Sequence, residues 1–251
     1  METLYLLLAC RTITFMALAP GIGGRLVPPL VRVGLGAWVS ALIATTYAQG
    51  WSGQPNVVQL AMLVAGEVAL GLVLAFAPAL CLSAVTSAGW LVDHSMGVGV
   101  VNVIDPMYGT AAPLMGNYLS LLTLALWFGC NGHHVLLLAL GESFRVVPPG
   151  GISQLRIAEL LKVMVGLIAS ATAASFSLAL PAIGVALLVD IWLGILSRSF
   201  PQVNAFIIGI PMKTLAVLVA LLLWGPALGM LGSWANGQIS RALRMVLAAL
   251  M

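Results

Sequence analysis

Apolar stretches separated by short breaks that contain Gly, Pro or a few polar residues make up almost the whole chain. An α-helix needs about 20 apolar residues to span a bilayer, and several of the stretches approach or exceed that length. The pattern predicts six or seven hydrophobic helical elements, with no linker or change of composition between them, and therefore a single all-α domain over residues 1–251. The stretches cover residues 4–19, 33–47, 57–92, 114–130, 163–189 and 214–235.

Composition assigns the chain to the membrane class. Hydrophobic residues make up 61% of it and charged residues only 7%, a balance that does not cover the surface of a soluble domain. The net charge of +3 is modest and the basic residues are scattered, so we expect no nucleic-acid partner. The first stretch follows Glu2, lacks a basic region before it and has no small-residue cleavage site, so we expect it to be retained as a helix in a membrane lipid environment.

Hydropathy alone gives no regular spanning topology. Basic residues place the first loop, the loop near residues 142–162 and the C-terminus on the cytoplasmic side. The stretch 57–92 is either one bent helix or a buried hairpin at Pro78. One bent helix puts the basic loop near residues 142–162 on the outer side, and a hairpin puts the loop that contains Arg198 there, both against the positive-inside rule. Because irregular backbone is tolerated at membrane depth only inside protein or beside water, the sequence predicts a subunit that packs against neighbouring proteins.

Two acidic residues, Glu67 and Asp190, lie within apolar stretches. An ionisable group at the bilayer centre costs about 2.5 to 3.5 kcal/mol and usually has a function. In a secondary transporter these carboxylates would be proton or ion sites. In an assembly subunit they would pair with basic groups of the same chain or of a neighbour, and the available groups are Arg11, Arg25, Arg198 and Lys213.

A metal site at His133 and His134, with Glu142 as a third ligand, is a further hypothesis, which would make the chain a metal-dependent membrane enzyme. Adjacent helical residues diverge by about 100°, and Glu142 lies about 12 Å further along the axis, so one ion does not reach all three. Motifs for serine hydrolases, nucleotide loops, paired thiols and zinc are missing from the sequence. We therefore predict no catalytic residue, no metal and no cofactor.

The segment DIWLGILSRSFPQVNAFIIGIPMK, residues 190–213, resembles the signature of the FliR family of flagellar export proteins and its injectisome counterparts. Other family-like motifs occur in the same order, so that the resemblance covers about residues 5–235: CRTITFMALAPGIGGRLVPPLVR, GEVALGL, AGWLVDHSMGVGVVNVIDP and LALWFGCNGHHVLLLALGESFRVVPPG. The signature residues are Asp190, Gly194, Arg198, Pro201, Gln202, Asn204, Gly209, Pro211 and Lys213.

The resemblance implies a structural and gating part of an export gate, and not an enzyme. It implies bent helical hairpins, interrupted by Pro and Gly, that join FliP and FliQ subunits at the entrance of a channel, with FlhB around the base and FlhA as the cytoplasmic neighbour. Unfolded exported proteins would pass through this channel in the bacterial inner membrane, within the flagellar basal body, and the gate would stand largely on the periplasmic side. The motif NVIDP in the central loop, residues 102–106, is more similar to the flagellar branch of the family than to its injectisome branch.

The resemblance also implies that the central loop, residues 102–113, plugs the closed pore. Its chemistry fits that role, because an Asp-Pro pair sets a turn, Gly adds flexibility, and Met and Tyr add bulk without strong charge. Such a constriction excludes water and ions. The plug residues that we expect are Asn102, Asp105, Pro106, Met107, Tyr108, Gly109 and Pro113.

A hairpin tip is expected between residues 197 and 213. Pro201 and Pro211 would stop two helices, and Asn204 would satisfy backbone groups at the turn. Arg198 and Lys213 would meet acidic groups of adjacent subunits. The further residues that we expect in assembly contacts are Arg11, Arg32, Glu67, Asp93 and Asp190.

Overall fold

The computed structural model describes residues 2–24, 27–47, 55–97, 113–151, 157–199 and 205–250. All regular secondary structure in these ranges is helical, which confirms the predicted all-α class. The helices are α1 (Glu2–Leu18), α2 (Pro29–Tyr47), α3 (Val57–Met96), α5 (Leu114–Gly129), α6 (Gly132–Val146), α7 (Ile157–Ser199), α8 (Ala205–Leu223), the short α9 (Gly225–Gly229) and α10 (Leu231–Ala249).

Contacts within the chain divide it into two compact units. The first unit comprises Met1–Cys81, Trp127–Ala169 and Ala235–Met251, and the second comprises Leu82–Leu126 and Ser170–Trp234. The long helices α3 and α7 each contribute to both units. The expectation of one domain over the whole chain stays a prediction.

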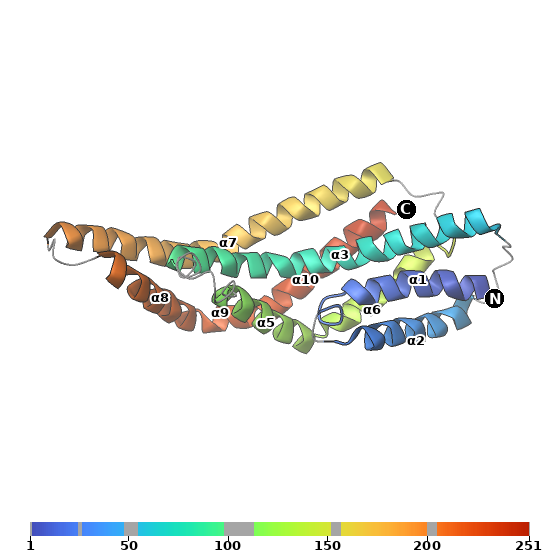
Figure 1. Ribbon diagram of the computed structural model, residues 1–251, viewed down its shortest axis with the longest axis horizontal. Coiled ribbons are helices and arrows are strands. Elements are labelled where there is room, and N and C mark those ends of the chain that lie inside the picture. Colours follow the sequence, from blue (N-terminus) through green and yellow to red (C-terminus); the bar gives the residue numbers. More distant parts are fainter. Residues whose placement is uncertain are drawn as a thin grey trace, which may run out of the picture. The chain divides into compact units, whose positions relative to one another are not determined.

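Antiparallel helix pairs recur within the units. In the first unit α1 and α2 lie side by side (Figure 1), and the Thr12 hydroxyl donates a hydrogen bond to the Gly36 carbonyl at 3.1 Å. In the second unit α7 and α8 run in opposite directions (Figure 1), with Leu193 packed close to Gly209. These pairs confirm the predicted helical hairpins.

Each unit has its own apolar core. In the first unit, large side chains from α1, α3, α6 and α10 are buried, including Leu7, Phe15, Leu74, Phe144 and Ile239. The core of the second unit contains many alanines, which allow its helices to approach closely. Its buried residues are Ala88, Val92, Met96, Met115, Ala179, Ala182, Ala186, Val217 and Leu221.

Residues 57–92, for which hydropathy left two alternatives, form part of one helix. At 1.5 Å per residue, the 40 residues of α3 extend about 60 Å and the 43 residues of α7 about 64 Å. Pro78 and Pro181 lie inside these helices without ending them. By length and composition, α3 and α7 are the helices of the described ranges that could each cross a membrane, and up to four crossings result if the bent pairs α5–α6 and α8–α10 are counted.

The prediction that Pro211 stops a helix is wrong, because Pro211 lies inside α8. A proline removes one backbone donor, and helices in apolar surroundings tolerate this loss when neighbouring groups compensate. The chain turns sharply elsewhere: α5 and α6 meet at a bend of 71°, where Asn131 has a positive φ of 57°. Pro201 and Asn204, the other residues of the predicted tip, lie outside the described residues.

Two glycines of α2 offer a matched test of the α1–α2 contact. A Cβ atom added at Gly36 would lie 2.8 Å from the Cα of Ile13, whereas one added at Gly34 would meet nothing within 4 Å. We expect Gly36→Ala to destabilise the chain by about 1 to 3 kcal/mol through overpacking. Gly34→Ala should be neutral or stabilising by up to about 1 kcal/mol. Thermal unfolding of the detergent-solubilised chain measures both, and equal effects would contradict the close packing.

Candidate functional site: polar contacts that join the helices

A buried ion pair connects α1 and α3 in the first unit. Arg11 Nε donates to Glu67 Oε2 at 2.6 Å, and both side chains are 0% exposed. The sequence analysis left open whether Glu67 pairs within the chain or with a neighbour, and the structure has the pair within the chain. Neither side chain reaches the surface of the chain, so the pair joins α1 and α3 within the first unit.

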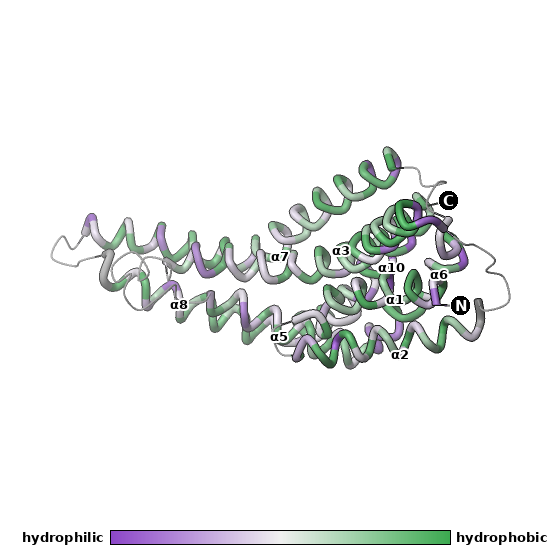
Figure 2. Tube along the Cα trace, turned by 45° about the vertical axis from the view of Figure 1, so that its right-hand side comes forward, coloured by the Kyte–Doolittle hydropathy of each residue, from purple (hydrophilic) through white to green (hydrophobic). Residues whose placement is uncertain are grey.

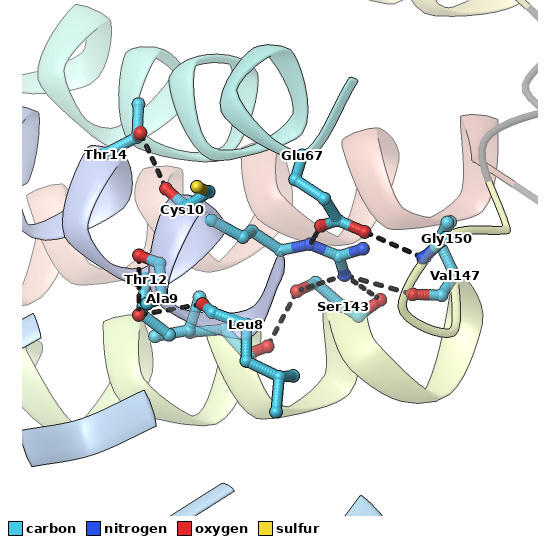
Figure 3. A network of polar contacts seen from close by, with 11 residues as sticks. Leu8, Ala9, Cys10, Thr12, Thr14, Glu67, Ser143, Val147 and Gly150 are labelled. Atoms are coloured by element: carbon cyan, nitrogen blue, oxygen red, sulfur yellow. Dashed lines mark hydrogen bonds and ion pairs between the residues drawn. The ribbon is translucent and has the colours of Figure 1, made fainter. Parts of the chain in front are cut away.

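The same pair also organises the C-terminal end of α6. Arg11 Nη1 donates to the carbonyls of Ser143 and Val147, each at 3.0 Å, and the guanidinium lies 4.2 Å from the centre of the Phe144 ring. A cation at a helix C-terminus meets carbonyls that lack helical partners and the negative end of the helix dipole. Figure 3 shows Ser143 and Val147 beside the guanidinium, with dashed lines to their carbonyls.

Glu67 extends the network to the turn after α6. Its second oxygen, Oε1, accepts a hydrogen bond from the backbone N–H of Gly150 at 3.0 Å (Figure 3). Gly150 has φ of 78°, a conformation that favours glycine. One ion pair therefore fixes α1, α3, α6 and the following turn relative to one another within the first unit.

Asp93 makes a second buried contact, in the second unit. Its side chain is on the last turns of α3, and its carboxylate accepts hydrogen bonds from the backbone N–H groups of Met115 and Gly116 at 3.0 to 3.1 Å. Asp93 is only 6% exposed. The predicted assembly residue is thus bound to the N-terminus of α5.

Asp190 and Lys213 form a third contact, between α7 and α8. Lys213 Nζ lies 2.5 Å from Asp190 Oδ1, with the Lys213 side chain 18% and the Asp190 side chain 46% exposed. Lys213 was expected to meet an acidic group of an adjacent subunit, and in the structure it has an acidic partner in its own chain. The pair joins the two helices of this hairpin and leaves part of the Asp190 carboxylate accessible.

The remaining predicted assembly residues are dispersed. Arg32 is half-buried and donates to the carbonyls of Gly24 and Val27 at 2.6 to 2.9 Å, so it binds backbone groups that precede α2. Arg198 is exposed in the last turn of α7. Of the predicted plug, Pro113 is described and immediately precedes α5, whereas the residues from Asn102 to Gly109 lie outside the described residues.

The two histidines of the metal hypothesis are exposed. His133 stacks on the ring of Phe128 with a centroid distance of 5.8 Å, and Glu142 pairs with Arg145 at 3.5 Å. Within the described ranges, no three His, Cys, Asp or Glu side chains are grouped so that they could hold a metal ion.

Sequence reasoning did not identify the acceptors and donors that complete these contacts. The carbonyls of Ser143 and Val147 and the N–H groups of Met115, Gly116 and Gly150 are backbone groups, which every residue type supplies. The ends of the predicted helices gave an indirect signal for these contacts. Backbone groups at helix ends lack intrahelical hydrogen-bond partners and therefore require partners from elsewhere.

Neutralising Glu67 should destabilise the first unit strongly. Glu67→Gln keeps the size of the side chain but leaves the Arg11 guanidinium without its anion, and breaking a buried pair costs about 3 to 5 kcal/mol. Glu159→Gln is the matched control, because Glu159 pairs with Lys162 at the surface, where such a pair contributes less than about 1 kcal/mol. Denaturant unfolding of the full chain in detergent compares the two variants. Equal losses of stability would contradict the structural role of the pair.

Comparison with known proteins gives extensive matches. The sequence model of the family described as bacterial export proteins, family 1, matches residues 3–237. The flagellar biosynthetic protein FliR of Bacillus subtilis (strain 168) is 30% identical over 227 residues, which cover 87% of this chain and 84% of the relative. FliR of Escherichia coli (strain K12) is 29% identical over 213 residues, covering 84% and 80%.

A secretion relative matches over a shorter length. The secretion system apparatus protein SsaT of Salmonella typhimurium is 32% identical over 164 residues, which cover 65% of this chain and 63% of the relative. The matches confirm the resemblance to the FliR family. The chain belongs to the family of bacterial export proteins, family 1, and it is similar to the flagellar FliR proteins of Bacillus subtilis and Escherichia coli along most of their length.

Proposed function

We propose that the chain is a structural and gating subunit of the flagellar type III protein export gate. In this proposal it forms the entrance of the channel with FliP- and FliQ-type subunits, has FlhB- and FlhA-type proteins as neighbours, and passes unfolded flagellar proteins across the inner membrane. It has no catalytic role. The observation that supports this best is the apolar surface of α7.

Large apolar side chains remain exposed along the entire length of α7. Figure 2 shows hydrophobic positions recurring from one end of the helix to the other. Only 22% of an apolar stretch of 18 residues in α7 is buried within the chain. The exposed residues include Ile157, Leu161, Val165, Ile168, Phe176, Leu180, Leu187, Leu188, Ile191 and Ile195.

Lipid alone does not cover this surface. The hydrocarbon core of a bilayer is about 30 Å thick, about half the 64 Å extent of α7. Apolar area left in water costs about 25 cal/mol per Å², and large exposed apolar patches mark interaction sites. Apolar helices of other subunits are therefore the partners that fit the part of α7 beyond the bilayer.

We propose the flagellar machine over the injectisome. Two flagellar FliR proteins match 84 to 87% of this chain, whereas the injectisome counterparts SsaT and SpaR of Salmonella typhimurium match 65% and 79%. Both kinds of relative support a component of a type III export apparatus. We place the chain in the bacterial inner membrane, and we propose that its assembled form belongs to the flagellar basal body and stands largely on the periplasmic side.

The transporter hypothesis is less well supported. A carboxylate that carries protons across a membrane must reach water, whereas Glu67 is fully buried and bound by Arg11. Asp190 is paired with Lys213 in the other unit. Both carboxylates instead make contacts that join two helices of the chain. A subunit of a large assembly requires such contacts to keep its shape.

Purification of the full chain in mild detergent, followed by mass spectrometry, tests the proposed assembly. We expect stoichiometric copurification with FliP- and FliQ-type proteins. Leu188→Arg, which introduces a charge on the exposed face of α7, should reduce the yield of this complex at least about tenfold, because burying an unpaired charge is costly. Leu188→Ile is the control and should assemble normally. A stable monomer without companions would contradict the proposal.

Deleting residues 105–113 tests the gating role separately. If the central loop closes the pore, cells that overproduce the gate with this deletion should leak small ions, because the constriction is lost. Potassium efflux from these cells is compared with efflux from cells that overproduce the unaltered gate at the same level. Unchanged permeability would reject the gating role while leaving the assembly intact.

A further inference from the structure

The Asp190 carboxylate is only partly occupied by its partner within the chain. Lys213 Nζ contacts Oδ1, and 46% of the Asp190 side chain remains exposed. An ionised carboxylate has two oxygens and accepts up to about four hydrogen bonds. The ion pair with Lys213 therefore leaves Asp190 able to accept a hydrogen bond from a second donor.

Exposed apolar side chains flank this carboxylate on the outer face of α7. Leu193 packs against Gly209, so α8 covers one side of this part of α7 (Figure 1). Leu187 and Ile191 lie within one helical turn of Asp190, and each is more than half exposed. The accessible acceptor thus stands among side chains that are suited to apolar contact.

Gly194 keeps the carboxylate accessible. Residues four apart lie on the same face of a helix, and a helical side chain covers the turn that precedes its own Cα. A side chain at position 194 would therefore lean over Asp190. A Cβ added at Gly194 would meet nothing within 4 Å in the described part of the chain, so packing inside the chain does not require glycine there. Glycine disfavours a helix, but small residues let a second apolar helix approach closely.

A helix that covers this face would bury the carboxylate. A buried polar group without a hydrogen-bond partner is costly, and more so when it is ionised. Asp190 and Lys213 already balance each other in charge, so a further buried cation would add an unpaired charge. An uncharged N–H or O–H group satisfies the carboxylate without that cost.

We infer that α7 has a specific contact point for a neighbouring subunit: an apolar helix crosses α7 at Gly194 and donates a hydrogen bond from an uncharged side chain to Asp190. Ser, Thr, Asn and Gln carry the required donor. The inference rests on the proposed function, which supplies a helical neighbour for α7, and it adds the chemistry of that neighbour. The competing interpretation is that the pair of Asp190 and Lys213 only joins α7 to α8.

Replacing the ion pair with two leucines separates these interpretations. Asp190→Leu with Lys213→Leu removes both charges together, and apolar replacement of a whole ion pair is often neutral for stability. The full chain is titrated in detergent with the FliP- and FliQ-type subunits of the proposed function. We expect the double leucine variant to lower the association constant about five- to hundredfold, because the neighbour's donor is then buried without an acceptor. If the pair only joins α7 to α8, binding is unchanged.

A second variant and two controls accompany this measurement. Gly194→Leu should weaken binding at least about tenfold through overpacking, although the chain alone has room for the side chain. Gly34→Leu, at a glycine of α2 with equally open surroundings among the described residues, should bind normally. Glu159→Leu with Lys162→Leu removes the exposed ion pair near the start of α7 and should also bind normally. Thermal unfolding of each isolated variant checks that it is folded, and Gly194→Leu decides if the double leucine variant is not.

Photo-crosslinking identifies the neighbour's donor. A photoreactive residue replaces Ile191 in the assembled complex, and the crosslinked peptide is sequenced. We expect an apolar segment of about 20 residues, with Ser, Thr, Asn or Gln within about one turn of the crosslinked position. Replacing that donor with alanine should weaken binding of the unaltered chain. It should restore binding of the double leucine variant, because both partners of the hydrogen bond are then apolar.

Four results would overturn the inference. They are normal binding by a folded double leucine variant, normal binding by Gly194→Leu, equal losses in either control, and a crosslink to lipid, to a second copy of this chain or to a segment whose only polar group there is Lys or Arg. An unaltered chain that binds none of the subunits contradicts the proposed function itself. Binding by the unaltered chain and all its variants alike contradicts only the contact at Asp190.

Discussion

The hydrocarbon core of a bilayer is about 30 Å thick, and α3 and α7 each extend about twice that distance. Both helices are apolar over most of their length, and each is longer than the hydrocarbon core of one bilayer. This constraint explains why no regular topology follows from hydropathy. It also explains why the apolar positions continue beyond one crossing, since the helices are suited to packing against other apolar helices.

Few charges exist in the chain, and several of them join helices in the structure. Arg11 and Glu67 connect three helices of the first unit, Asp93 connects α3 with α5, and Asp190 with Lys213 connects α7 with α8. In apolar surroundings, hydrophobic contact alone gives little preference for one helix arrangement over another. Polar groups with unique partners supply that preference, because a wrong arrangement leaves a buried charge or backbone group unsatisfied.

The sequence predicted the helical class, the hairpins and the acidic residues that need partners. It did not choose between one helix and a hairpin at residues 57–92, because a single proline is compatible with both and packing decides. Pro211 was expected to end a helix, but apolar residues on both sides continue α8 through it. Much of α10 was missed because its apolar residues alternate with Arg241 and Arg244, although Ala235, Ile239 and Leu243 recur at helical spacing and are buried. The partners of Arg11 and Asp93 were beyond sequence reasoning, since most are backbone groups.

The central claim is that proteins, and not lipid alone, cover α7 along its length. Photo-crosslinking in cells tests it most directly, with a photoreactive amino acid placed in turn at exposed positions from Ile157 to Ile195. The account predicts crosslinks to other proteins over a stretch of positions too long for the roughly 30 Å hydrocarbon core. Crosslinks to lipid alone within a window of about 20 residues, and none to protein at any position, would contradict it.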